Sequence, residues 1–215
     1  MHRTSFFCLA FMAMAVMLCV GISIAGGREL QEVKIALTGT AETEAAFFPA
    51  QPGQGVIFAP GAMFSKESWY FLAERFQKLG ISSVALNSGS TPDLLNAIAY
   101  LKTMGVDKFA IVGASAGGAG VLFTLQDQKI DPGVDTVVLL APAGGVPITQ
   151  KNIKKLFIVA EDDMISSSAE VYNLYDASVD PKVYHELKGS DHAQRLFDGE
   201  LKEAVIGLVI DFIVK

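Results

Sequence analysis

Residues 108–125 contain the feature that most constrains the fold of this chain of 215 residues. Their sequence, KFAIVGASAGGAGVLFTL, has an apolar stretch at 109–112, a turn of small residues centred on Ser115, and an apolar segment from Gly118 onward. This order predicts a strand, a G-x-S-x-G turn and a helix. Glycine is needed two residues before and after the serine, because a Cβ atom there would collide with the neighbouring strand or helix.

A turn of this kind places the serine between the end of the strand and the start of the helix. We expect Ser115 to have a strained backbone, with its hydroxyl beside the first free N–H groups of the helix. The motif therefore favours a nucleophilic serine. The alternative is a plain strand-to-helix turn, because a bare G-x-S-x-G occurs by chance in roughly one chain in ten of this composition. A P-loop is excluded, since Ala119 stands where lysine is required.

The first 25 residues have the pattern of an export signal. Basic residues at 2–3 precede an apolar run at 6–21, and Ser23-Ile24-Ala25 offers small residues at the positions that signal peptidase recognises. We therefore predict a signal peptide at 1–25 and an exported protein, periplasmic or secreted, whose single domain is 26–215. An uncleaved membrane anchor at 6–25 is the alternative, because the run approaches the length of a bilayer span.

Composition argues against several other functions for the predicted mature chain. Both cysteines, Cys8 and Cys19, lie in the predicted signal, so no thiol is left for catalysis, metal binding or a disulfide. The net charge of −6 argues against nucleic acid or an anionic membrane surface as a partner. His185 and His192 fall on different predicted elements and form no recognisable zinc site. We expect no metal and no cofactor.

Strand and helix signals alternate from residue 32 to the end of the chain, which predicts a parallel sheet covered by helices on both faces. Segment 41–53 is interpreted as an irregular excursion, and it is the one segment expected to be able to fold over a site. Segment 141–155 is rich in proline and glycine and has no room for a cap domain. The predicted strands are 33–37, 56–59, 81–86, 109–112, 136–140, 156–160 and 182–187, and the predicted helices begin near 65, 91, 118, 168 and 201.

A reactive serine needs a base that accepts its proton, and histidine is the usual one. His192 follows strand 182–187 in a loop at its carboxyl end, the edge of a parallel sheet where Ser115 is also expected. His185 lies inside that strand and is interpreted as a structural or partly exposed residue. We therefore predict His192 as the base.

The base in turn needs a carboxylate that holds it in one tautomer. Glu161, Asp162 and Asp163 directly follow strand 156–160. Position favours Asp163, and Asp162 is the alternative. An acidic cluster of this kind is most often only a solvated turn.

The negative oxygen formed in acyl transfer needs backbone N–H donors. One predicted donor is Ala116, directly after the serine. The second is expected in the turn Ala59-Pro60-Gly61-Ala62-Met63, from Ala62 or Met63, because this turn follows an early strand.

Together these motifs resemble the α/β-hydrolase superfamily over nearly all of residues 33–215. The turn at 60–61 is similar to the His-Gly oxyanion turn of that family, with proline in place of histidine, and 113–118 is similar to its nucleophile elbow. Asp163 matches its acid and His192 its base. Within the superfamily the chain resembles small, uncapped esterases of the dienelactone-hydrolase type, although the type enzyme has cysteine where this chain has Ser115.

The resemblance implies a three-layer α/β/α fold with a mostly parallel central sheet and no cap domain. It also implies a carboxylesterase that acts on a small-molecule ester through an acyl-enzyme on Ser115. A thioesterase or a peptidase would use the same three residues. A binding protein with an idle triad is a further alternative, because a fold does not guarantee an activity.

Overall fold

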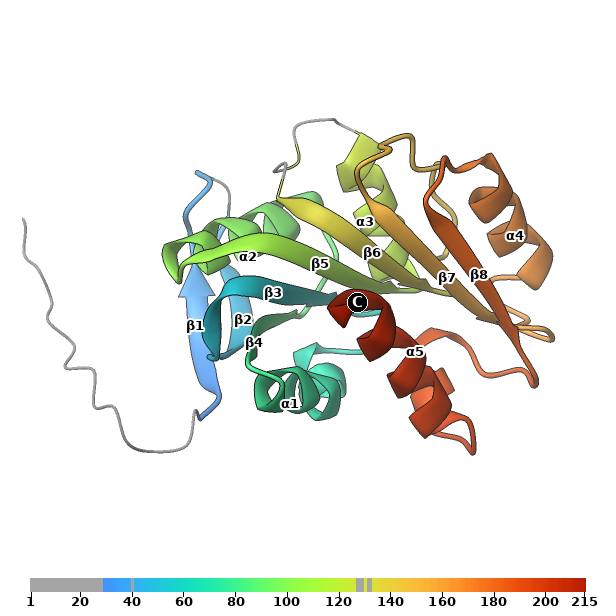
Figure 1. Cartoon of the computed structure of the whole chain (residues 1–215), viewed down its shortest axis with the longest axis horizontal. Coiled ribbons are helices and arrows are strands. Elements are labelled where there is room, and N and C mark those ends of the chain that lie inside the picture. Colours follow the sequence, from blue (N-terminus) through green and yellow to red (C-terminus); the bar gives the residue numbers. More distant parts are fainter. Residues whose placement is uncertain (1–28, 40, 127–129, 131–132) are drawn as a thin grey trace, which may run out of the picture.

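A computed structural model describes residues 29–39, 41–126, 130 and 133–215. The predicted signal or anchor at 1–25 lies outside these residues. In the described part of the chain, eight strands form one sheet in the order β1-β2-β4-β3-β5-β6-β7-β8 (Figure 1). Neighbouring strands from β4 to β8 run parallel, whereas β2 is antiparallel to both of its neighbours.

Each element of the sheet and its two covering layers has the following bounds. The strands are β1 (Gln31–Ile35), β2 (Thr43–Phe48), β3 (Gln51–Ala59), β4 (Ile81–Leu86), β5 (Val106–Ala114), β6 (Val134–Leu140), β7 (Lys154–Ala160) and β8 (Lys182–Leu187). The helices are α1 (Tyr70–Lys78), α2 (Thr91–Thr103), α3 (Ala116–Gln126), α4 (Ser168–Ala177) and α5 (Lys202–Val214), with the short 3-10 helices η1 (Lys66–Trp69) and η2 (Ala193–Phe197).

Helices cover both faces of the sheet, as the alternating pattern predicted. Figure 1 shows α2, α3 and α4 on one side and α1 and α5 on the other. The central strands consequently bury both faces, and the run from Phe109 to Ala114 in β5 is buried throughout. Such strands are continuously apolar because neither face meets water. The result is the predicted three-layer α/β/α arrangement.

Segment 41–53 is not the irregular excursion that the sequence indicated. It contains all of β2 and the start of β3, and β2 lies between β1 and β4 in the sheet. Phe47 and Phe48 are buried, and the ring of Phe47 packs edge-on against Tyr100 at 5.2 Å between centroids. These phenylalanines belong to the core and do not fold over the site.

The connection from β6 to β7, residues 141–153, contains neither a helix nor a strand. Its proline and glycine content predicted this. No cap domain is inserted in the residues that the structure describes, so the carboxyl edge of the sheet carries only loops and the short helices η1 and η2 there. Among the same residues, no helix is both long and apolar enough to cross a bilayer.

Candidate active site

The G-x-S-x-G turn joins the end of β5 to the start of α3. Ser115 has a φ of +48°, in the left-handed region that non-glycine residues rarely adopt. A Cβ atom on Gly113 would lie 2.8 Å from the Cα atom of Gly118, and one on Gly117 would lie 2.3 Å from the carbonyl oxygen of Ala59. Glycine is therefore required on both sides of the strained serine.

Three of the predicted side chains form one hydrogen-bonded chain. Nε2 of His192 lies 2.8 Å from Oγ of Ser115, and its Nδ1 lies 2.8 Å from Oδ2 of Asp163. The Asp163 side chain is fully buried, whereas Asp162 is exposed. A carboxylate against Nδ1 holds the neutral ring in the tautomer whose Nε2 accepts a proton. The arrangement can therefore take the proton from the Ser115 hydroxyl.

Backbone groups hold the Asp163 carboxylate in place. Its Oδ1 accepts hydrogen bonds from the N–H groups of Ile165 at 2.8 Å and Ser166 at 3.0 Å. The other oxygen, Oδ2, is the one that contacts His192. Because the two oxygens have different partners, the carboxylate is fixed against rotation and its orientation toward the imidazole is set by the loop.

The loops that carry Asp163 and His192 are tied to each other. The N–H of Glu161 donates to the carbonyl oxygen of Leu187 at 2.8 Å, where β7 and β8 end side by side. The ammonium group of Lys188 also donates to the Glu161 carboxylate. This hydrogen bond lowers the pKa of Glu161 and raises the pKa of Lys188. The sheet therefore sets the spacing between the two loops, and the exposed ion pair adds little to it.

The predicted oxyanion donors lie on two sides of Ser115. Ala116 is the first residue of α3, so its N–H has no acceptor within the helix. The turn after β3 lies directly against the serine, because a Cβ atom on Gly61 would be 3.2 Å from the Cβ of Ser115. The structure brings this turn to the site and leaves both Ala62 and Met63 as candidates for the second donor.

Gln194 is a site residue that the sequence reasoning missed. Its side chain is buried, and its Oε1 accepts the N–H of Gly61 at 2.7 Å, while its amide donates to the hydroxyl of Ser68. Because the N–H of Gly61 already donates to Gln194, it is not available as an oxyanion donor. Glutamine carries no reactive group, so the only signal was its place two residues after His192.

The sequence matches no family model and no curated protein. Solved structures are similar, however. An esterase from Pyrococcus furiosus has a TM-score of 0.70 at 15% identity and covers 86% of this chain and 91% of its own. An α/β hydrolase from Penicillium has a TM-score of 0.69 at 15% identity, covering 86% and 98%. A dienelactone hydrolase from Anabaena variabilis has a TM-score of 0.68 at 16% identity, covering 86% and 97%. This chain has the α/β-hydrolase fold.

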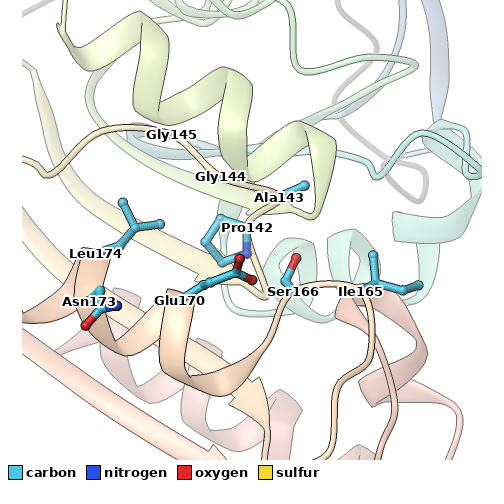
Figure 2. Close-up of a pocket in the computed structure, with 9 residues that line it drawn as sticks. All are labelled: Pro142, Ala143, Gly144, Gly145, Ile165, Ser166, Glu170, Asn173 and Leu174. Atoms are coloured by element: carbon cyan, nitrogen blue, oxygen red, sulfur yellow. The ribbon is translucent and has the colours of Figure 1, made fainter.

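Two cavities flank the elbow of this α/β-hydrolase fold. One, here the α4 cavity, has about 540 Å³ and lies between the loop 142–145 and residues 165–174 (Figure 2). The other, here the α3 cavity, has about 530 Å³ and is bordered by 60–62, 87–90 and the start of α3. Ala143 lines both cavities, and its N–H donates to the carbonyl oxygen of Ser115 at 3.0 Å. Both cavities therefore reach the loop that contacts the serine.

His185 stands apart from these groups. It is half-buried in β8 and lines a hollow beside α5, together with Leu208 and Phe212. The structure thus gives His185 no contact with Ser115. Within the described ranges, no group of three or more histidine, cysteine or acidic residues has an arrangement suited to a metal ion.

Proposed function

We propose that this protein is a serine hydrolase that cleaves carboxylic esters through an acyl-enzyme on Ser115. The observation that carries the proposal is the hydrogen-bonded chain from Ser115 through His192 to the buried Asp163, with both contacts at 2.8 Å. The strained elbow at Ser115 adds support. Esterases among the solved structures of the same fold agree with this reaction class.

In the proposed reaction, Oγ of Ser115 forms a bond to the ester carbonyl carbon while its proton passes to Nε2 of His192. Asp163 stabilises the resulting imidazolium. The carbonyl oxygen becomes an oxyanion and accepts hydrogen bonds from Ala116 and from Ala62 or Met63. The bond to the alcohol oxygen then breaks, and His192 gives its proton to that oxygen. Water attacks the acyl-enzyme by the same route and releases the acid.

We further propose that the acyl chain is short. The α3 cavity contains the proposed donors Ala116 and Ala62, so it lies where the acyl group meets the oxyanion site. No cap encloses it in the described part of the chain, and Phe47 and Phe48 lie in the core. Each acyl methylene contributes about 0.8 kcal/mol only when it is enclosed. A long acyl chain therefore gains little on this surface.

A fluorophosphonate probe tests the proposed nucleophile. The probe should add one covalent group to the wild-type protein, located by peptide mass spectrometry on Ser115. His185→Gln should be labelled as fast as wild type, whereas His192→Gln should be labelled far more slowly. An unlabelled wild-type protein would favour a binding protein with an idle triad. A thioesterase or peptidase would be labelled too, and is distinguished by turnover of thioester and amide substrates.

Export is proposed on the sequence alone. If signal peptidase cuts after Ala25, the mature protein begins at Gly26. Intact-mass analysis of protein from its native host decides between this and retention of residues 6–25 as a membrane anchor.

A further inference from the structure

The α4 cavity contains a buried hydroxyl group that has no partner. Ser166 is 3% exposed, and its Oγ makes no hydrogen bond to any part of the chain that the structure describes. Figure 2 shows this hydroxyl pointing toward the loop 142–145 across the cavity. Buried hydroxyls in native proteins almost always have a partner, because an unpaired one loses its hydrogen bonds to water. Either a water molecule or a molecule bound in the cavity can supply this missing partner.

A carboxylate, that of Glu170, lines the same cavity and is held in position. Oε2 of Glu170 accepts from the backbone N–H of Ser167 at 3.1 Å, and the Glu170 N–H donates to the Ser167 hydroxyl oxygen at 3.3 Å, which together form the capping box of α4. The Ser167 hydroxyl also donates to the same carboxylate oxygen at 2.9 Å. Figure 2 shows the Glu170 side chain reaching from α4 toward the loop that carries Pro142. Asn173 follows one helical turn later and also lines the cavity. One wall of the cavity is therefore polar, with both donors and acceptors.

The position of the α4 cavity relates it to one side of the proposed reaction. The N–H of Ser166 donates to the Asp163 carboxylate that holds His192. The cavity thus lies on the acid and base side of Ser115, whereas the α3 cavity lies on the oxyanion side. His192 must give its proton to the departing alcohol oxygen, so the alcohol portion has to leave on the acid and base side.

We propose that the α4 cavity binds the alcohol portion of the ester and that this portion carries free hydroxyl groups, as in an ester of glycerol or of a sugar. This inference rests on the proposed ester hydrolysis. The Ser166 hydroxyl and the Asn173 amide can each donate and accept, and the Glu170 carboxylate accepts, which suits neighbouring hydroxyl groups. An alkyl alcohol would leave the buried Ser166 hydroxyl without a partner. A quaternary ammonium group favours aromatic rings, and no aromatic residue lines the cavity.

Two esters with the same acyl group test the proposal. Glyceryl butyrate and propyl butyrate differ only by two hydroxyl groups on a three-carbon alcohol. The measured quantity is the ratio of kcat/KM for the glyceryl ester to kcat/KM for the propyl ester. We expect a ratio of about ten or more in the wild-type protein, since each added hydroxyl gains a hydrogen bond.

Variants of the polar wall should lower this ratio. Ser166→Ala and Glu170→Gln are each expected to reduce it about three- to tenfold. Glutamine can still accept the Ser167 bonds of the capping box, so α4 keeps its N-terminus. Tyr172→Phe, on the same helix but outside the cavity, is the matched control and should keep the wild-type ratio. The ratio cancels any general loss of activity that arises through Asp163.

The opposite results are equally clear. A wild-type ratio near one, or an equal loss of kcat/KM for both esters in Ser166→Ala, would show that the Ser166 hydroxyl is hydrogen-bonded to water and has only a structural role. Faster turnover of butyrylcholine than of either ester would assign the cavity to a cation.

If the two butyrate esters and p-nitrophenyl acetate are all left intact, the proposed ester hydrolysis itself fails. A crystal structure of Ser115→Ala with glyceryl butyrate should place a glycerol hydroxyl within hydrogen-bond distance of Ser166 Oγ.

Discussion

Gln194 connects the two halves of the proposed active site at the scale of a single residue. It lies two residues after the proposed base His192, and it holds the turn at Gly61 that faces the serine. Ala193 between them has a φ of +51°, which turns the chain so that the histidine and the glutamine point to different parts of the site. A side chain with no acid or base chemistry thus holds the turn that is proposed to supply the second oxyanion donor.

Replacing Gln194 by methionine should reduce kcat about tenfold to a hundredfold and change KM little. Methionine fills a similar volume but cannot accept the Gly61 N–H, so the second oxyanion donor loses its position, which matters only in the transition state. Steady-state kinetics with p-nitrophenyl acetate measure this split. Ser68→Ala keeps the contact between Gln194 and Gly61, so its kcat should fall less than threefold. Equal losses in both variants would contradict a positioning role.

The proposed acid can be tested against its neighbour in sequence. In Asp163→Asn, the new amide would face Nδ1 of His192 and force the proton onto Nε2, where it blocks transfer from Ser115. We expect kcat to fall about a thousandfold or more. Asp162 is exposed, and the kcat of Asp162→Asn should stay within twofold of the wild-type value. A loss in Asp162→Asn, with none in Asp163→Asn, would show that the acid was wrongly assigned.

At the scale of elements, strand pairing brings the separate parts of the site together. β5 lies between β3 and β6, with Gly113 opposite both Ala59 and Leu139. The turn after β3 and the loop after β6 therefore emerge beside the elbow, on either side of it. This register explains why residues from 60 to 194 in the chain meet at one edge of the sheet.

Local signals determined which elements could be predicted from the sequence. Strands 81–86 and 182–187 and the helix predicted to begin near 168 agree with the structure because their apolar patterns and caps are local. β2 was missed because four successive residues, 45–48, are buried and show no alternation, and because its pairing with β1 and β4 is long-range. The meeting of Ser115, His192 and Asp163 could be anticipated from the shared sheet edge. Gln194 and the two cavities could not, since they depend on tertiary packing.

Close contact between α3 and the turn after β3 makes Gly117 a sensitive position. Gly117→Ala would force a Cβ atom to within 2.3 Å of the Ala59 carbonyl oxygen, so we expect a loss of at least about 2 kcal/mol in the free energy of unfolding. Gly207→Ala in α5 is the control, because no atom lies within 4 Å of the new Cβ. It should gain about 0.5–1 kcal/mol. Urea denaturation measures the free energy of unfolding of both variants. An unchanged value for Gly117→Ala would contradict the close packing of α3 against the turn after β3.

At the scale of the whole molecule, the site lies on one edge of a sheet that carries only loops and two short 3-10 helices in the described part of the chain. The connection 141–153 runs past Ser115 without adding a helix, and 41–53 is used for the sheet. Access to the serine is therefore controlled by loops, and the polar α4 cavity and the α3 cavity lie on opposite sides of it.

This open architecture predicts the dependence on acyl-chain length. With p-nitrophenyl esters, kcat/KM should be highest from acetate to butyrate and should not rise for palmitate, because no wall encloses the added methylenes. Activity should also show no jump when the ester exceeds its solubility limit, since no lid is displaced. A series that rises steadily beyond eight carbons would show that the acyl chain is enclosed after all.

The most direct test of the central claim is turnover of p-nitrophenyl acetate by Ser115→Ala compared with the wild-type protein. Alanine removes the oxygen that forms the acyl-enzyme but leaves His192, Asp163 and the proposed oxyanion donors in place. We predict that kcat falls by about three orders of magnitude or more, while circular dichroism and the melting temperature show that the variant is folded. A folded Ser115→Ala protein with more than a tenth of wild-type turnover would contradict the account.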